Sequence, residues 1–269
     1  MADLAASGFI EIAHQRLKYI YHAGSAANAP MLVMLHEGLG SAGLWGDFPA
    51  FLAAAAGYGV FAYSRAGYGA SSLAPLPRPL TYMHDEADQV LGPVLDAIRF
   101  ERGFLVGHSG GASIAAIYAG KHKDPRISGL CLIAPHFFAE EITIAAIQSA
   151  KNAYVTTDLR FRLARWHGNA DAAFRGWNDA WLDPEFRALN IGEFLPVITS
   201  PVLVIQGGED QYGSAAQVEL AQRLIQAPVD VCIMPGVTHA PHREAREATI
   251  AAIKAFTSKA LASKTFGPN

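Results

Sequence analysis

One segment constrains the fold more than any other: an apolar run that passes through three glycines and a serine into an alanine-rich stretch. Residues 105–120 read LVGHSGGASIAAIYAG. The apolar run is typical of a buried strand, and the stretch that follows is typical of a helix. A strand and a helix joined by so short a turn nearly touch, so the positions around the turn must be small. The segment therefore places Ser109 at a sharp turn between a buried strand and the N-terminus of a helix.

Similar apolar runs alternate with helical patterns along most of the chain. One or two leading strands are expected within 9–23. Further strands are expected at 31–36, 59–64, 103–108, 127–135, 201–207 and 229–236. Helices are expected at 43–57, 81–100 with a kink at Pro93, 110–120, 214–226 and from about 243. Continuously apolar strands that alternate with helices predict an α/β fold, with a parallel sheet covered by helices on both faces.

The alternation stops between residues 136 and 196, where the sequence is helical and rich in aromatic residues. We therefore predict a core made of residues 1–135 and 197–269, with a helical lid, residues 136–196, inserted between two strands. Trp166, Trp177 and Trp181 have two interpretations: they anchor the small core of the lid, or they form an apolar roof over a pocket. The lid arginines predict a solvated face, or, for one of them, a contact with a substrate carboxylate: Arg160, Arg162, Arg165, Arg175 and Arg187.

Composition excludes several classes of protein. Hydrophobic residues make up 51% of the 269 residues and charged residues 17%, which excludes a disordered chain or a coiled coil. A net charge of −3 gives no basic footprint for nucleic acid or for an anionic membrane surface. No apolar run reaches the roughly 20 residues of a membrane span, and the first residues lack a signal-peptide pattern. We therefore expect a cytoplasmic protein.

The two cysteines are expected to be free thiols. Cys131 and Cys232 each lie inside an apolar, strand-like run, and buried free thiols are common. In the expected sheet order the strand at 201–207 lies between their strands, which separates the two sulfurs by more than a disulfide allows. No cysteine and histidine spacing is typical of zinc, so no metal site is predicted.

The glycine-serine turn carries a chemical signature as well. Gly107, Ser109 and Gly111 form the G-x-S-x-G pattern of a nucleophile elbow, which exposes the serine hydroxyl at the carboxyl edge of the sheet. A helix N-terminus beside the hydroxyl favours an oxyanion. His108 is expected to be a packed neighbour of the elbow. The pattern predicts that Ser109 is a catalytic nucleophile.

A serine nucleophile needs a base, and the base needs a residue that orients it. The loop GEDQYG follows a predicted strand and offers Glu209 and Asp210. The loop GVTHAPH follows the last strand and offers His239 and His242. Both loops leave the carboxyl ends of strands, where ligands bind in open α/β sheets. The residues alone do not decide which of the two acids orients the base, or which of the two histidines is the base.

From VMLHEGLGS to GVTHAPHRE the sequence resembles the α/β-hydrolase family. The similarity is to its lid-bearing branch of small esterases, meta-cleavage-product hydrolases and haloperoxidase-like enzymes. It implies a mostly parallel eight-stranded sheet with helices on both faces and a helical lid between two strands. The family's G-x-x-D and G-x-x-H patterns imply that Asp210 is the acid and His239 the base, with Ser109 as the nucleophile.

The loop HEGLG stands where the family has its oxyanion loop, but Glu37 occupies a position where glycine is usual. The resemblance implies that the backbone N–H groups of Gly110 and Gly38 hold the oxyanion, with Glu37 as the other candidate for the second donor. A carboxylate near the developing negative charge would repel it, so the Glu37 side chain is expected to point away. It then makes a loop-stabilising hydrogen bond or contacts substrate. Ser64, in SRAGYGAS, stands where many members carry aspartate.

Serine at the nucleophile position implies acyl chemistry, because haloalkane dehalogenases and epoxide hydrolases use aspartate there. The expected function is a serine hydrolase that cleaves a small, fairly apolar carboxylic ester through an acyl-enzyme, without a metal or an organic cofactor. Two alternatives remain: a C–C bond hydrolase of meta-cleavage-product type, and a hydrolase-fold signal receptor with little turnover. The expected partner is a small-molecule substrate, not nucleic acid or a membrane, and the oligomeric state is left open.

Overall fold

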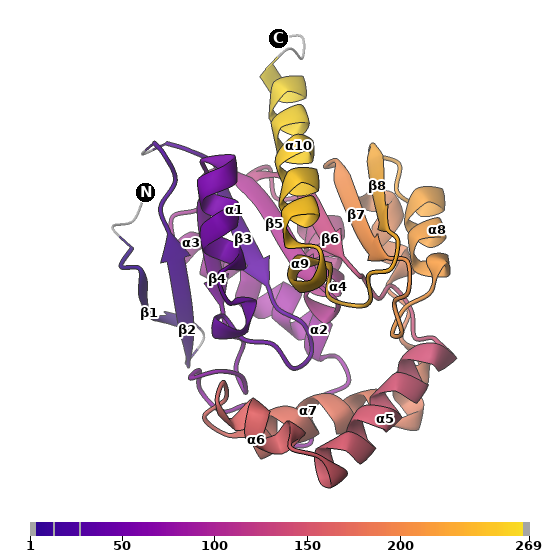
Figure 1. Ribbon diagram of the computed structural model, residues 1–269. Helices are drawn as coiled ribbons and strands as arrows, with labels where there is room; N and C mark the ends of the chain where they lie inside the picture. Colours follow the sequence, from indigo (N-terminus) through magenta and orange to yellow (C-terminus); the bar gives the residue numbers. More distant parts are fainter. Residues whose placement is uncertain (1–3, 13, 27, 266–269) are drawn as a thin grey trace.

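An eight-stranded sheet forms the centre of the computed structural model, which describes residues 4–12, 14–26 and 28–265 (Figure 1). The strands are β1 (Ser7–Ile12), β2 (Gln15–His22), β3 (Met31–Leu35), β4 (Gly59–Tyr63), β5 (Gly103–His108), β6 (Ile127–Ile133), β7 (Val202–Gly207) and β8 (Val229–Met234). Their order in the sheet is β1-β2-β4-β3-β5-β6-β7-β8. β2 pairs antiparallel with β1 and β4, and the remaining pairs are parallel. The mostly parallel eight-stranded sheet is thus confirmed.

Burial explains why the central strands form. Every residue of β3, β4, β5, β6 and β7 is buried, as a strand covered on both faces requires. The leading segment forms two strands, β1 and β2, at the edge of the sheet. There exposed and partly buried residues alternate along β1, because one face of an edge strand meets solvent.

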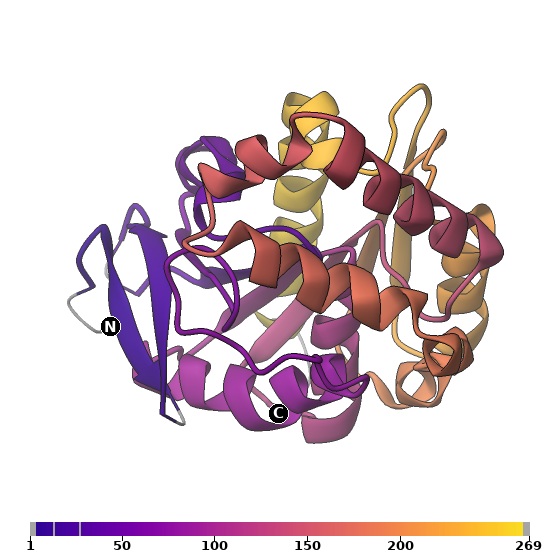
Figure 2. The ribbon, with the colours of Figure 1, turned by 90° about the horizontal axis from the view of Figure 1, so that it is seen from below.

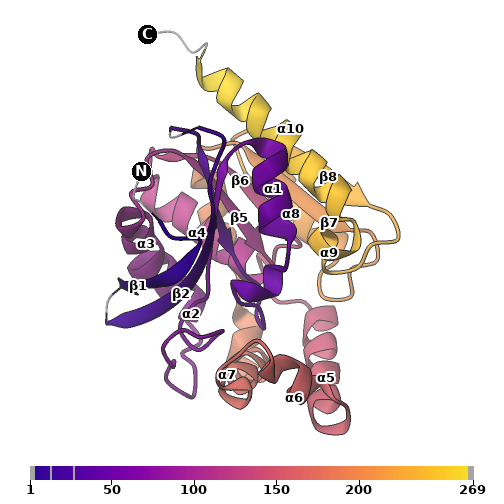
Figure 3. The ribbon, with the colours of Figure 1, turned by 60° about the vertical axis from the view of Figure 1, so that its left-hand side comes forward.

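Helices cover both faces of the sheet, and each face has its own hydrophobic core (Figure 3). α1 (Phe48–Ala56) and α10 (Arg246–Thr265) pack on one face, with Leu32 and Met34 of β3. The neighbouring residues Val33 and Leu35 point to the other face. That face is covered by α2 (Tyr82–Asp85), α3 (Gly92–Ala97), α4 (Gly110–His122) and α8 (Ala215–Leu224). A short helix, α9 (Pro241–Glu244), precedes α10.

Two of the predicted helices are divided in the structure. Segment 43–57 forms a 3-10 helix, Gly43–Trp45, and then α1, because Gly46 between them has a φ of 59°. Segment 81–100 contains α2, a π-helical stretch at Glu86–Leu91, and α3. Pro93 stands in the first turn of α3, where it has no N–H to donate to the preceding turn, so the helix ladder is interrupted there.

The segment between β6 and β7 is helical. It contains α5 (Glu141–Thr156), α6 (Leu159–Ala164), α7 (Ala170–Leu182) and the 3-10 helices Pro184–Ala188 and Gly192–Val197. Asn169 caps α7, its side chain accepting a hydrogen bond of 2.9 Å from the N–H of Ala172. Figures 1 and 2 show α5, α6 and α7 beyond one end of the sheet, and Figure 2 shows α5 and α7 crossing in front of it.

The sheet order separates the two cysteines as expected. Cys131 lies in β6 and Cys232 in β8, with β7 between them, and both thiols are free. Among the helices of the described residues, none is both long and apolar enough to span a bilayer.

Candidate active site

Ser109 occupies the turn between β5 and α4 in a backbone conformation that non-glycine residues rarely adopt. Its φ is 54° and its ψ is −122°. A Cβ at Gly107 would lie 2.4 Å from Cα of Ala112, and one at Gly111 would lie 2.1 Å from the carbonyl oxygen of Leu35. Close packing of strand, turn and helix therefore holds Ser109 in its strained geometry, and only glycine fits two positions before it and two positions after it.

His239 and Asp210 come from two different loops and meet at the carboxyl edge of the sheet. His239 follows β8 and Asp210 follows β7. His239 Nδ1 lies 2.8 Å from Oδ2 and 2.9 Å from Oδ1 of Asp210. Since a carboxylate only accepts hydrogen bonds, Nδ1 carries the proton and donates it, which leaves Nε2 free to accept one. The pair thus has the tautomer that a general base requires.

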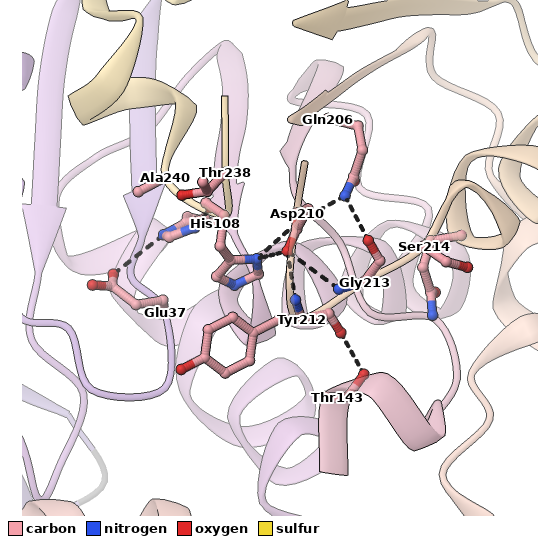
Figure 4. Close-up of polar contacts among 12 residues, drawn as sticks. Glu37, His108, Thr143, Gln206, Asp210, Tyr212, Gly213, Ser214, Thr238 and Ala240 are labelled. Atoms are coloured by element: carbon pink, nitrogen blue, oxygen red, sulfur yellow. Dashed lines mark hydrogen bonds and ion pairs between the residues drawn. The ribbon is translucent and has the colours of Figure 1, made fainter. Parts of the chain in front are cut away.

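The carboxylate of Asp210 is buried and well supplied with donors (Figure 4). Besides His239, it accepts hydrogen bonds from Gln206 Nε2 at 2.7 Å and from the N–H groups of Tyr212 at 2.7 Å and Gly213 at 3.2 Å. Burial alone would raise the pKa of Asp210, but the hydrogen bond and charge of His239 and the N–H of Tyr212 lower it below its ordinary value. Asp210 is therefore ionised at neutral pH. Glu209, its neighbour, is exposed.

Burial also controls the charge of His239. It lowers the pKa of His239, and the hydrogen bond that His239 donates to Asp210 opposes that shift only in part. His239 is therefore neutral at neutral pH, as a base must be before it accepts a proton. His242, the other candidate from the sequence, is buried elsewhere: its ring packs 4.7 Å from the rings of Trp45 and His108.

Ser109 and His239 line one cavity of about 120 Å³ together with residues of five other segments. The lining residues are Glu37, Gly38, Leu39, Ser109, His136, Thr143, Ile147, Trp177, Trp181, Tyr212 and His239. Among the hydrogen bonds of the described residues, none joins the Ser109 hydroxyl to His239. Catalytic hydrogen bonds are often long in ligand-free structures and tighten when substrate binds.

Of Trp166, Trp177 and Trp181, two face this cavity. Trp177 and Trp181 of α7 line it and are buried, whereas Trp166 is 46% exposed and packs near Gly43. The five arginines between 160 and 187 are all exposed, and four of them pair with acidic side chains nearby. None of the arginines is a lining residue of the cavity.

The loop after β3 lies beside the serine. Gly38 lines the cavity, and the indole of Trp177 covers it so closely that a Cβ on Gly38 would lie 2.2 Å from Nε1. Gly110 is the first residue of α4, where an N–H has no acceptor within the helix. Gly110 thus adjoins Ser109 in the chain, and Gly38 lines the same cavity as the serine.

A buried arginine fixes the course of that loop. Arg65 is 1% exposed and donates to the carbonyl oxygens of His36 at 2.5 Å and Glu37 at 3.0 Å. The adjacent Ser64 accepts a hydrogen bond of 2.9 Å from the N–H of Ala42. The sequence analysis noted the segment SRAGYGAS only for Ser64 and did not predict which carbonyl groups Arg65 binds.

The carboxylate of Glu37 faces His108 (Figure 4). Its Oε2 lies 3.5 Å from Nδ1 of His108, and its Oε1 lies 3.6 Å from the guanidinium of Arg243. Burial alone would raise the pKa of Glu37, but His108, Arg243 and His242 lower it well below the ordinary value. His108 in turn donates from Nε2 to the carbonyl oxygen of His239 at 2.8 Å. Glu37 therefore supports the loop that carries His239.

Several lining residues were missed by the sequence analysis. His136, Thr143, Ile147 and Tyr212 all face the cavity. His136 follows β6 at the carboxyl edge of the sheet, which was a usable signal. Thr143 and Ile147 lie on α5, and nothing in the sequence shows which side of that helix faces the cavity. Within the part of the chain that the structure describes, no group of three or more His, Cys, Asp or Glu side chains is placed to hold a metal ion.

Comparisons with known proteins place this geometry in a family. Residues 32–252 match the model of the alpha/beta hydrolase family. Proline iminopeptidase from Mycobacterium smegmatis is similar in structure, with a TM-score of 0.78 and 18% identity over 96% of this chain and 99% of that one. The enol-lactonase from Burkholderia xenovorans LB400 is also similar, with a TM-score of 0.74 and 19% identity over 93% of this chain and 100% of that one.

The esterase RhEst1 from Rhodococcus sp. ECU1013 gives a TM-score of 0.72 and 23% identity over 94% of this chain and 99% of that one. No curated protein matches the chain in sequence. The family model covers most of the chain, including the serine turn, the acid loop and the histidine loop. The chain belongs to the alpha/beta hydrolase family.

Proposed function

We propose that the protein is a serine hydrolase that cleaves small, fairly apolar carboxylic esters through an acyl-enzyme. One observation carries the proposal: a strained serine and a histidine bound through Nδ1 by a buried carboxylate line the same cavity. The esterase and the enol-lactonase among the similar structures support acyl chemistry at such a site. Ser109, His239 and Asp210 are the proposed catalytic triad.

In the first half of the reaction, Ser109 Oγ attacks the carbonyl carbon of the ester while its proton passes to His239 Nε2. Asp210 holds the imidazole and stabilises the imidazolium that forms. The N–H groups of Gly110 and Gly38 donate to the oxyanion of the tetrahedral intermediate. When the intermediate collapses, the C–O bond to the alcohol breaks and His239 returns the proton to the leaving oxygen.

In the second half, water replaces the alcohol. His239 Nε2 removes a proton from the water, whose oxygen attacks the carbonyl carbon of the acyl-enzyme. The bond to Ser109 Oγ then breaks, Oγ takes the proton from His239, and the carboxylic acid leaves. Each half uses the same oxyanion donors, so no further group is needed to complete the cycle.

The cavity itself suggests the substrate class. Its volume of about 120 Å³ is similar to that of a cavity that holds benzene, so the acyl or alcohol part within it is small. We propose that residues 136–196 form a lid, with Trp177 and Trp181 as an apolar roof. No lysine or arginine occurs among the described lining residues. An uncharged ester therefore fits better than a dienoate, whose carboxylate would be buried without a cation.

Hydrolysis of 4-nitrophenyl acetate and butyrate tests the proposal. We expect multiple turnovers by the parent protein and a loss of at least about a thousandfold in Ser109→Ala, since removal of a serine nucleophile has effects of this size or larger. Ser149→Ala, an exposed serine of α5, is the matched control and keeps full activity. A parent that releases one equivalent and stops would be a receptor, and an active Ser109→Ala variant would contradict the proposed nucleophile.

A further inference from the structure

A second histidine faces the cavity and has no part in the proposed proton transfer. His136 follows β6, is 2% exposed and lines the cavity. Its ring stands edge-on to Trp181 with 5.4 Å between the ring centres, and 5.5 Å from the ring of His239. Its carbonyl oxygen accepts a hydrogen bond of 2.6 Å from Ser113 Oγ, which fixes its backbone. The imidazole is thus held at the reacting end of the cavity.

The imidazole of His136 has no hydrogen-bond partner among the described residues. Its Nδ1 is buried without one, and no hydrogen bond to the other ring nitrogen is present either. A buried polar group without a partner destabilises the folded protein by about 1–3 kcal/mol. In a cavity-lining residue, the missing partner is most simply a ligand atom.

The other polar side chains of the cavity are mostly occupied by protein partners. Thr143 Oγ1 donates to the carbonyl oxygen of Tyr212 at 2.5 Å, and Trp181 Nε1 donates to the hydroxyl of Tyr82 at 3.0 Å. The carboxylate of Glu37 faces His108 and Arg243. Two other lining groups make no hydrogen bond among the described residues and compete with His136: the hydroxyl of Tyr212 and the indole N–H of Trp177. His136 is therefore well placed to recognise a substrate atom outside the ester group.

The chemistry of that atom follows from the charge of the site. Burial lowers the pKa of His136 to about 3, so the ring is neutral at neutral pH and offers one N–H donor and one acceptor. With no lysine or arginine among the lining residues, a carboxylate here would lack a cation. A keto, ether or hydroxyl oxygen accepts the N–H of a neutral imidazole without this penalty.

We propose that His136 is a specificity-determining residue that binds an uncharged oxygen of the substrate, a few bonds from the scissile carbonyl. The preferred substrates are then small esters with a keto, ether or hydroxyl oxygen, rather than esters with pure hydrocarbon groups. This inference rests on the proposed function, because it assumes that the ester lies between Ser109 and His239.

Two ester pairs that differ by one oxygen test the inference. Ethyl 4-oxopentanoate is compared with ethyl pentanoate for the acyl side, and 2-methoxyethyl pentanoate with butyl pentanoate for the alcohol side. Their Kd values are measured in the Ser109→Ala background from the fluorescence of the cavity tryptophans, and kcat/KM is measured in the parent. We expect the oxygen-bearing member of at least one pair to be preferred by about three- to tenfold, as one net hydrogen bond gives.

Variants then identify the residue responsible. The preference is the ratio of kcat/KM, or of affinity, between the oxygen-bearing ester and its hydrocarbon partner. His136→Phe, or His136→Leu if the phenyl ring does not pack, is expected to reduce this ratio to about one. His136→Gln keeps a donor and an acceptor and is expected to keep part of the preference. Tyr212→Phe, the matched control on the same cavity, is expected to keep the full ratio.

Three results would overturn the inference: no preference in either pair, a preference that survives His136→Phe, or one that disappears in Tyr212→Phe instead. The proposed function fails separately. If the Ser109→Ala variant binds esters with the expected preference while the parent hydrolyses none of them, His136 recognises the oxygen and the assignment as an esterase is wrong.

Discussion

Asp210 and Glu209 are adjacent in sequence, but the loop after β7 gives them different surroundings. Asp210 is buried and bound to His239, whereas Glu209 is exposed. We expect Asp210→Asn to reduce kcat/KM by about 10⁴-fold, since an amide neither fixes the tautomer of His239 nor stabilises its imidazolium. Glu209→Gln is the matched control, and as a surface change it is expected to reduce kcat/KM by about threefold or less.

Both variants are assayed on one ester between pH 7 and 9. Equal losses would mean that the loop matters only as a whole. A larger loss in Glu209→Gln would mean that Glu209, not Asp210, is the acid that orients His239, and it would contradict the observed contact between Asp210 and His239.

The proposed role of His239 as the base predicts how the activity depends on pH. Burial lowers its pKa below the ordinary value of 6.5, while Asp210 acts in the opposite direction. Only the neutral imidazole accepts a proton from Ser109, so kcat/KM falls as the pH drops through the pKa of His239. We expect the midpoint of this acid limb below pH 6.5, and lower still in Asp210→Asn, which loses the groups that raise the pKa. A midpoint at or above 6.5 in the parent, or a rise in the variant, would show that these influences are misjudged.

Among the elements, the turn from β5 into α4 makes the most stringent demand on sequence. A Cβ at Gly111 would lie 2.1 Å from the backbone oxygen of Leu35, which cannot move without disturbing β3. We expect Gly111→Ala to destabilise the protein by about 1–3 kcal/mol. Gly110→Ala is the control, because the nearest atom to a Cβ there is Met83 Sδ at 3.7 Å. Thermal unfolding measures both, and equal Tm values for the two variants would contradict the packing.

The elements that the sequence predicted well are those fixed by local pattern. β3, β5 and β7 are short, mostly apolar runs, and such runs form buried strands wherever helices cover both faces. The helix predicted at 43–57 starts late because Gly46 adopts a positive φ, which a periodic pattern does not reveal. The interruption near Pro93 was foreseen as a kink, but the π-helical stretch before it, which packs against α4, was not.

In the candidate site, too, some features could be predicted from the sequence and others depend on contacts between distant residues. The loops with Asp210 and His239 could be found because the carboxyl ends of parallel strands meet at one edge of a sheet. The contacts of Glu37 and Arg65 could not, since each reaches a residue far away in the chain. Trp166 lies between α6 and α7 and is half exposed, whereas Trp177 lies on α7, whose packing over Gly38 places it at the cavity.

For the molecule as a whole, the order of strands makes a prediction about the thiols. Cys131 is buried in β6, where burial raises its pKa, and Cys232 is partly buried in β8. We expect thiol titration to count two groups in denaturant without reductant. In the native protein Cys232 is expected to react faster, because its sulfur is more accessible. A count of zero, or faster labelling of Cys131, would be incompatible with this sheet.

The most direct measurement of the central claim is the position of the covalent bond formed by a fluorophosphonate. This reagent phosphonylates an activated serine, with loss of fluoride, and peptide mass spectrometry locates the adduct. We expect one adduct per chain, on Ser109, with no labelling of Ser109→Ala and slower labelling of Asp210→Asn, while Ser149→Ala reacts like the parent. An adduct on another residue, or undiminished labelling of Ser109→Ala, would contradict the account of this protein as a serine hydrolase built around Ser109.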